Sequence, residues 1–127
     1  MKHAIVLLYV LIVLALANIA TTLLSFKKDP VSMQDRQTII RGGIVFNTYC
    51  VLCHGENADG KGRLSEGKIP PPANLTASLL TDQMKEDIIR KGGSAVGRSP
   101  FMPPWGEELS NEQIRDLIYY LNVIKVK

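Results

Sequence analysis

"FNTYCVLCHGENADGKG", residues 46–62, places two cysteines three positions apart and a histidine directly after the second. If Cys50 to His54 lies at a helix end, Cys50 and Cys53 are related as i and i+3, and His54 follows Cys50 at i+4. All three side chains then project towards one side of the helix. Two thiols and one imidazole therefore converge at the head of a glycine-rich loop.

Cys-x-x-Cys-His is the attachment signature of c-type haem, in which both thiols add across vinyl groups and the histidine reaches the iron. A thioredoxin-like redox site also has a Cys-x-x-Cys pair, but at a helix start in a βαβ scaffold, and no strand pattern precedes it here. Zinc needs about four ligands, and the chain has only two cysteines and two histidines. The motif predicts one covalently bound haem c, with a haem-free thiol–disulfide module as the least favoured alternative.

An electron carrier needs a sixth iron ligand opposite the histidine, and methionine is the available residue type. Of the four methionines, two precede the motif, and Met84 falls in a helical pattern where packing is its expected role. Met102 differs, because prolines at positions 100, 103 and 104 hold its neighbourhood out of helix. We therefore expect His54 and Met102 to be the metal ligands.

Composition limits the chain to one small domain without a nucleic-acid partner. Its 127 residues, 46% of them hydrophobic, have room for one compact domain of about 100 residues. Aromatic residues make up only 6%, so a core of side chains alone would be thin. The formal net charge is +3 with acids and bases interspersed, which gives no nucleic-acid footprint.

The N-terminal segment is long and apolar enough to cross a membrane. Residues 4–26 carry no charge, and as a helix they would be about 34 Å long. A cleaved signal peptide is the alternative, because Ala15-Leu16-Ala17 has the small-x-small form that signal peptidase accepts. We expect an anchor at 1–27, in contact with lipid through residues 4–26, a linker at 28–37 and a domain at 38–127.

Three helices are predicted after the linker. Apolar residues in 34–53, among them Ile40 and Ile44, recur at spacings of three to five. A second helix runs from an N-cap at Thr81 to glycines at 92 and 93. The third begins at Ser110 with a capping box to Gln113 and extends to about position 124. The prediction is an all-α fold, whose long loops wrap something other than protein.

These segments resemble class I c-type cytochromes. "CVLCHGENADGKG" is similar to the family's haem-binding segment, and "MPPWGEELSNEQIRDLIYYL" to its methionine loop and last helix. Gly42 and Phe46 match a glycine and an aromatic residue of the first helix, and Tyr120 matches an aromatic residue of the last. The resemblance covers nearly all of residues 38 to 124, and implies a cytochrome c-like fold of three main helices around one haem.

The resemblance also implies supporting residues. The family uses a backbone carbonyl after the motif to orient the ligating histidine, and we expect it within Ile69 to Pro72, at Pro70 or Pro71. Trp105 is expected mainly to fill the core, and its indole N–H also has the position to bond a haem propionate.

With both axial positions filled, the chain is expected to transfer single electrons at a positive reduction potential. It would serve as a respiratory carrier or as the cytochrome c subunit of a larger membrane redox complex, with redox proteins as partners. A peroxidase-like haem enzyme with a displaceable methionine is the alternative. The resemblance places the haem domain outside the cytoplasmic membrane of a bacterium, facing the periplasm or the cell exterior.

Overall fold

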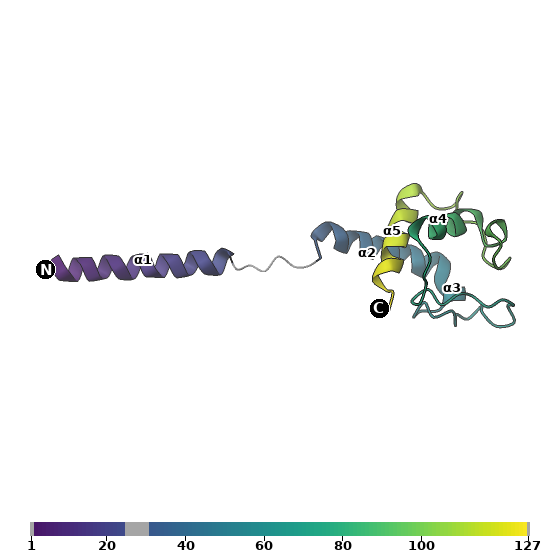
Figure 1. The fold of residues 1–127 in the computed structure, drawn as a ribbon, viewed down its shortest axis with the longest axis horizontal. Helices are drawn as coiled ribbons and strands as arrows, with labels where there is room; N and C mark the ends of the chain where they lie inside the picture. Colours follow the sequence, from purple (N-terminus) through teal and green to yellow (C-terminus); the bar gives the residue numbers. More distant parts are fainter. Residues whose placement is uncertain (1, 25–30, 127) are drawn as a thin grey trace. The chain divides into compact units, whose positions relative to one another are not determined.

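The computed structural model describes residues 2–24 and 31–126, and they divide into two compact units. The first unit ends at Val31, and the second begins at Ser32 and continues to the C-terminus. Within the described residues every regular element is a helix, as Figure 1 shows. The predicted all-α fold class is confirmed.

The described part of the first unit contains one helix, α1 (Lys2–Leu24), and between residues 2 and 19 apolar residues occupy every face of it. Its side chains from Lys2 to Ile19 are exposed, and this stretch qualifies by length and mean hydropathy (2.1) as a candidate membrane span. A signal sequence passes the same test. Residues 25–27 of the expected anchor and 28–30 of the expected linker lie outside the described residues.

The second unit begins with α2 (Met33–Val45), which is capped at its N-terminus by Ser32. The Ser32 hydroxyl accepts a hydrogen bond from the Asp35 backbone N–H at 3.1 Å, and the Asp35 carboxylate accepts one from the Ser32 N–H at 3.2 Å. Residues 33–37, expected in the linker, are therefore helical. An aspartate in place of the usual glutamate or glutamine at the third position concealed this capping box in the sequence.

The expected single helix at 34–53 is three consecutive segments. After α2 come a π-helical turn, η1 (Phe46–Cys50), and α3 (Val51–His54). The predicted apolar face is wrong at three positions, because Ile40, Ile44 and Leu52 are 62%, 60% and 39% exposed. The helix instead buries Gly42, Val45, Phe46 and Cys50.

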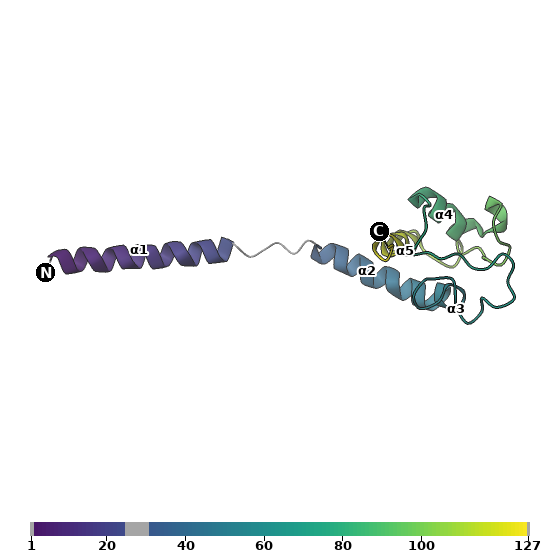
Figure 2. The ribbon, with the colours of Figure 1, turned by 60° about the horizontal axis from the view of Figure 1, so that its bottom comes forward.

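The close approach of α2 to α5 (Asn111–Val123) decides which face is buried (Figure 1, Figure 2). A Cβ at Gly42 would lie 2.1 Å from the Asp116 carbonyl oxygen, so only glycine allows this crossing. The Phe46 and Tyr120 rings pack beside it with centroids 5.6 Å apart. Gly42, Phe46 and Tyr120, the residues that match the family's first and last helices, therefore meet at this crossing.

The two later helices have the predicted caps. In α4 (Asp82–Lys91), the Thr81 hydroxyl accepts from the Met84 N–H, and Gly92 ends the helix. In α5 the Ser110–Gln113 capping box forms as expected. A short 3₁₀ turn, η2 (Ser94–Val96), follows α4. Long segments without helix, 55–81 and 97–110, join these elements.

Candidate functional site

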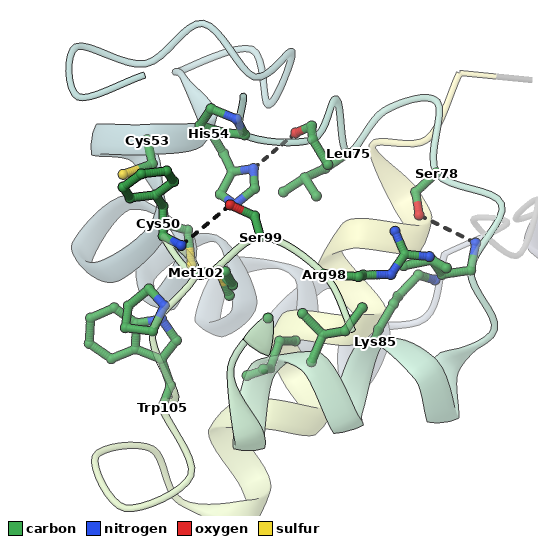
Figure 3. Close-up of a pocket in the computed structure, with 18 of the residues that line it drawn as sticks. Cys50, Cys53, His54, Leu75, Ser78, Lys85, Arg98, Ser99, Met102 and Trp105 are labelled. Atoms are coloured by element: carbon green, nitrogen blue, oxygen red, sulfur yellow. Dashed lines mark hydrogen bonds between the residues drawn. The ribbon is translucent and has the colours of Figure 1, made fainter. Parts of the chain in front are cut away.

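The second unit contains an open cavity of about 570 Å³, lined by η1, α3, α4, α5 and the two long loops. Side chains from these separate parts of the chain meet there, as Figure 3 shows. The structure brings all seven of the residues singled out in the sequence to its wall: Cys50, Cys53, His54, Pro70, Pro71, Met102 and Trp105.

Cys50 and Cys53 stand on η1 and α3 as free thiols, Cys50 buried and Cys53 partly buried. Burial, together with the neighbouring Cys53, raises the pKa of Cys50 to about 12. A dithiol redox site needs the opposite, an attacking thiol whose pKa is lowered. The environment of Cys50 therefore disfavours a thiol–disulfide module. Both cysteines line the cavity.

The His54 ring is held by one backbone hydrogen bond. Its Nδ1–H donates to the Ala73 carbonyl oxygen at 2.9 Å, because a carbonyl can only accept. This bond leaves Nε2 with a free lone pair. Burial lowers the pKa of His54, and the Ala73 bond offsets part of that effect. The ring is therefore an oriented, neutral nitrogen donor.

The carbonyl that accepts the hydrogen bond from His54 was expected within Ile69–Pro72. This prediction is wrong by one residue, because the acceptor is the Ala73 carbonyl. Residues 55–64, which follow α3, are called the glycine loop. A Cβ at Gly60 would lie 2.4 Å from the Pro72 carbonyl oxygen, so that carbonyl packs against the glycine loop. The next carbonyl, of Ala73, points to His54, and the Leu75 N–H then donates to the Ala58 carbonyl at 2.7 Å. Two contacts with the glycine loop thus set the direction of the Ala73 carbonyl.

The glycine loop also completes the end of α3, a role that the sequence did not reveal. The N–H groups of Gly60, Gly62 and Leu64 donate to the carbonyls of residues 54, 53 and 52, at 2.8, 3.1 and 2.7 Å. The last carbonyls of a helix have no partner within it. The loop supplies these partners and fixes the segment that carries Cys53 and His54.

Met102 is positioned by the C-terminal end of α4. The Gly93 N–H donates to the Met102 carbonyl at 2.9 Å, and the Trp105 N–H donates to the Ile89 carbonyl at 2.8 Å. A Cβ at Gly93 would lie 2.0 Å from the Ser99 carbonyl oxygen, so the methionine loop packs directly on this glycine. Trp105 packs edge-to-face on Tyr49, with centroids 5.2 Å apart.

The family model described as "Cytochrome C oxidase, cbb3-type, subunit III" matches residues 37–121. The chain belongs to this family. As a cbb3-type subunit III cytochrome domain, it binds haem c. The residues around the cavity fit this cofactor: two thiols at one side, an imidazole whose Nδ1 is already bonded, and a thioether on a braced loop.

Two curated relatives match 84% and 66% of this chain. Subunit CcoP of a cbb3-type cytochrome c oxidase from Azospirillum brasilense is 28% identical over 84% of this chain and 34% of its own. Subunit FixP of such an oxidase from Azorhizobium caulinodans is 34% identical over 66% of this chain and 26% of its own. The chain therefore spans about a third of the length of these relatives or less.

One solved structure shares the fold. It is a chain of the reducing HAO-like protein complex of Kuenenia stuttgartiensis, with a TM-score of 0.56 and 29% sequence identity. The similarity covers 75% of this cytochrome domain's chain and 43% of the other.

Proposed function

We propose that this chain transfers single electrons as a membrane-anchored cytochrome c and is not itself a catalyst. The observation that carries the proposal is the convergence of the imidazole of His54 and the thioether of Met102 on one cavity (Figure 3). Bound haem c supplies an iron that alternates between the ferrous and ferric states.

The roles of the individual residues follow from their chemistry. Cys50 and Cys53 hold the cofactor through thioether bonds. His54 ligates through Nε2, because its Nδ1–H is committed to Ala73. Met102 would supply its thioether from the loop that packs on Gly93, and Pro70, Pro71 and Trp105 form part of the cavity wall. A neutral thioether and an apolar wall both favour the ferrous state, so the midpoint potential is positive.

Exposure of the purified protein to carbon monoxide and cyanide tests this function against the peroxidase-like alternative. We expect neither ligand to bind the wild type within minutes, because the Met102 thioether would already be bound to the iron. Met102→Ala should bind both and should have a lower midpoint potential. Met84→Ala is the matched control, because Met84 is 46% exposed on α4, and it should behave as the wild type.

Rapid binding of carbon monoxide by the unmodified protein would contradict the assignment of Met102. Loss of the red colour on denaturation would contradict the attachment at Cys50 and Cys53, because thioether bonds retain the cofactor in an unfolded chain.

We further propose that α1 anchors the domain to the bacterial cytoplasmic membrane, with the haem domain on the periplasmic side. Two relatives are named as subunits of a cbb3-type oxidase and a third as part of a HAO-like complex, which supports redox proteins of a membrane complex as partners. Solubilisation of native membranes in mild detergent, followed by identification of the co-migrating proteins, tests this. Protease treatment of spheroplasts tests the orientation, since a periplasmic domain is digested without lysis.

A further inference from the structure

The wall of the cavity carries charge of one sign. Among the described residues that line it, the charged side chains are Lys68, Lys85 and Arg98, and no carboxylate is present. Lys85 is buried, Lys68 is partly buried and Arg98 is exposed. A cation beside an apolar cavity can pair with an anionic group of the molecule that fills it. The cavity is therefore complementary to a ligand that has both a large apolar surface and carboxylate groups.

Lys85 is the one of these three cations that is buried and so has little contact with water. It is only 8% exposed. In the described part of the chain, Lys85 and Asp116 are the two charged residues that are buried, and they lie in different ion pairs. Its ammonium group donates to Asp82 Oδ1 at 3.0 Å and to the amide oxygen of Asn122 on α5. An ammonium has three N–H donors, so one remains for a group in the cavity.

The cations and the cysteines occupy different sides of the cavity. In Figure 3, Cys50 and Cys53 lie on the left of the pocket, whereas Ser78, Lys85 and Arg98 lie together on the right. In a haem the two vinyl groups occupy one half of the ring and the two propionates the other. Attachment of the vinyl half at Cys50 and Cys53 therefore directs the propionates away from the cysteines.

We propose that Lys85 and Arg98 bind the haem propionates, with the buried Lys85 as the main partner. This assignment rests on the proposed haem attachment at Cys50 and Cys53. Asp82 is a positioning residue, because its carboxylate holds the Lys85 ammonium without lining the cavity. Asn122 aligns the same group from α5.

The test measures the midpoint potential of the holoprotein as a function of pH for the wild type and for Lys85→Gln. Loss of the cation destabilises the ferrous state, because less positive charge then opposes the ferric iron, so the potential falls. A nearby opposite charge lowers the pKa of a carboxyl group by about 1 to 3. Removal of the cation in Lys85→Gln should therefore raise the propionate pKa. Because ionisation of a propionate lowers the potential, the fall of the potential with rising pH should begin about one pH unit or more higher than in the wild type. The charged groups facing Lys85 are Asp82 on α4 and Arg98 beyond η2.

Three further variants separate propionate binding from packing. Lys85→Arg keeps the charge and should restore the wild-type curve. Asn122→Ala removes the link to α5 but keeps the cation, so it should lower stability and leave the potential near the wild-type value. Arg98→Gln, at an exposed position, should shift the curve in the same direction as Lys85→Gln but less.

Unchanged curves in both Lys85→Gln and Arg98→Gln would overturn the proposal while leaving the electron-transfer function intact. An equal shift in Asn122→Ala would also overturn it, because the effect would then follow from packing. Failure of the proposed function has a different signature: a wild-type protein without covalent haem.

Discussion

At the scale of single residues, the direction of one carbonyl decides how the iron ligand is held. The sequence located the acceptor for His54 to the proline segment but missed Ala73 by one residue. A carbonyl's direction depends on the backbone dihedrals on either side of it, and here contacts with Gly60 and Ala58 set them. Since those contacts come from a different part of the chain, the sequence of the segment could not specify them.

Gly42 gives the sharpest prediction at this scale. Gly42→Ala should destabilise the domain by about 2 kcal/mol or more, because overpacking costs about 1–3 kcal/mol and here the new Cβ meets backbone. It would lie 2.1 Å from the Asp116 carbonyl oxygen and 2.6 Å from Tyr120 Cβ. The free energy of unfolding of the holoprotein in guanidinium chloride measures the effect.

Gly43→Ala is the matched control, one position along the same helix. Its Cβ would lie 3.4 Å from the Tyr120 ring, an ordinary contact. The substitution should stabilise α2 by about 0.5–1 kcal/mol, the helix propensity difference between alanine and glycine. If both variants were equally stable, the close crossing of α2 and α5 would be wrong.

At the scale of elements, the caps of α4 and α5 were predicted from the sequence, whereas the cap of α2 and the face that α2 buries were not. The caps at Thr81 and Ser110 were predicted correctly, because a cap depends on residues three positions apart. The buried face of α2 was not, because Ile40 and Ile44 have the right spacing yet stay exposed. Gly42, without a side chain, determines the contact with α5, and hydrophobic periodicity cannot reveal a glycine.

A hydrogen bond between Asp35 at the start of α2 and Tyr119 on α5 predicts a pH-dependent link between these helices. Hydrogen bonds from Ser32 and then Tyr119 lower the pKa of Asp35. The bond to Asp35, with burial and its charge, raises the pKa of Tyr119. The bond needs an ionised carboxylate and a neutral phenol, so it is complete between about pH 5 and 9.

The stabilisation by the Asp35–Tyr119 bond is lost in both directions of pH, through Asp35 in acid and through Tyr119 in base. A lowered carboxyl pKa stabilises the fold above the unfolded value near 4, and this is lost as the pH falls through the folded value. A raised phenol pKa stabilises the fold below about 10, and this is lost as the pH rises through the folded value. Tyr119→Phe should therefore be less stable than the wild type at neutral pH and approach it at both extremes.

A double-mutant cycle with Asp35→Asn and Tyr119→Phe, measured by denaturant unfolding at pH 7, isolates the pair from the capping role of Asp35. The two single effects should add to more than the double effect. Strict additivity at pH 7 would show that the two side chains do not interact.

At the scale of the whole molecule, we predict that membrane attachment depends on the first unit and electron transfer on the second. All described residues that line the cavity lie in the second unit, and the family match begins at residue 37. Residues 32–127, exported to the periplasm behind a cleavable leader, should therefore fold with the spectrum and midpoint potential of the full chain. They should also leave the membrane fraction, which fractionation and a haem stain measure.

The control is the full chain with Ala15→Leu and Ala17→Leu, which removes the small-x-small pattern. Its mass and its place in the membrane fraction should match those of the wild type if α1 is a retained anchor. A truncated domain that still sediments with membranes would show that α1 is not the attachment. A shortened wild-type protein would show that the segment is a cleaved signal.

The sequence by itself determined the cofactor, the all-α class and the caps at Thr81 and Ser110. Each of these depends on residues that are near neighbours in the chain: a thiol pair with its imidazole, or a hydroxyl three residues before an amide. Only the tertiary structure decided the Ala73 acceptor, the face that α2 buries and the placement of Lys85 in the cavity wall. These depend on where distant segments meet, and that is set by packing at Gly42, Gly60 and Gly93, where the absence of a side chain lets backbones touch.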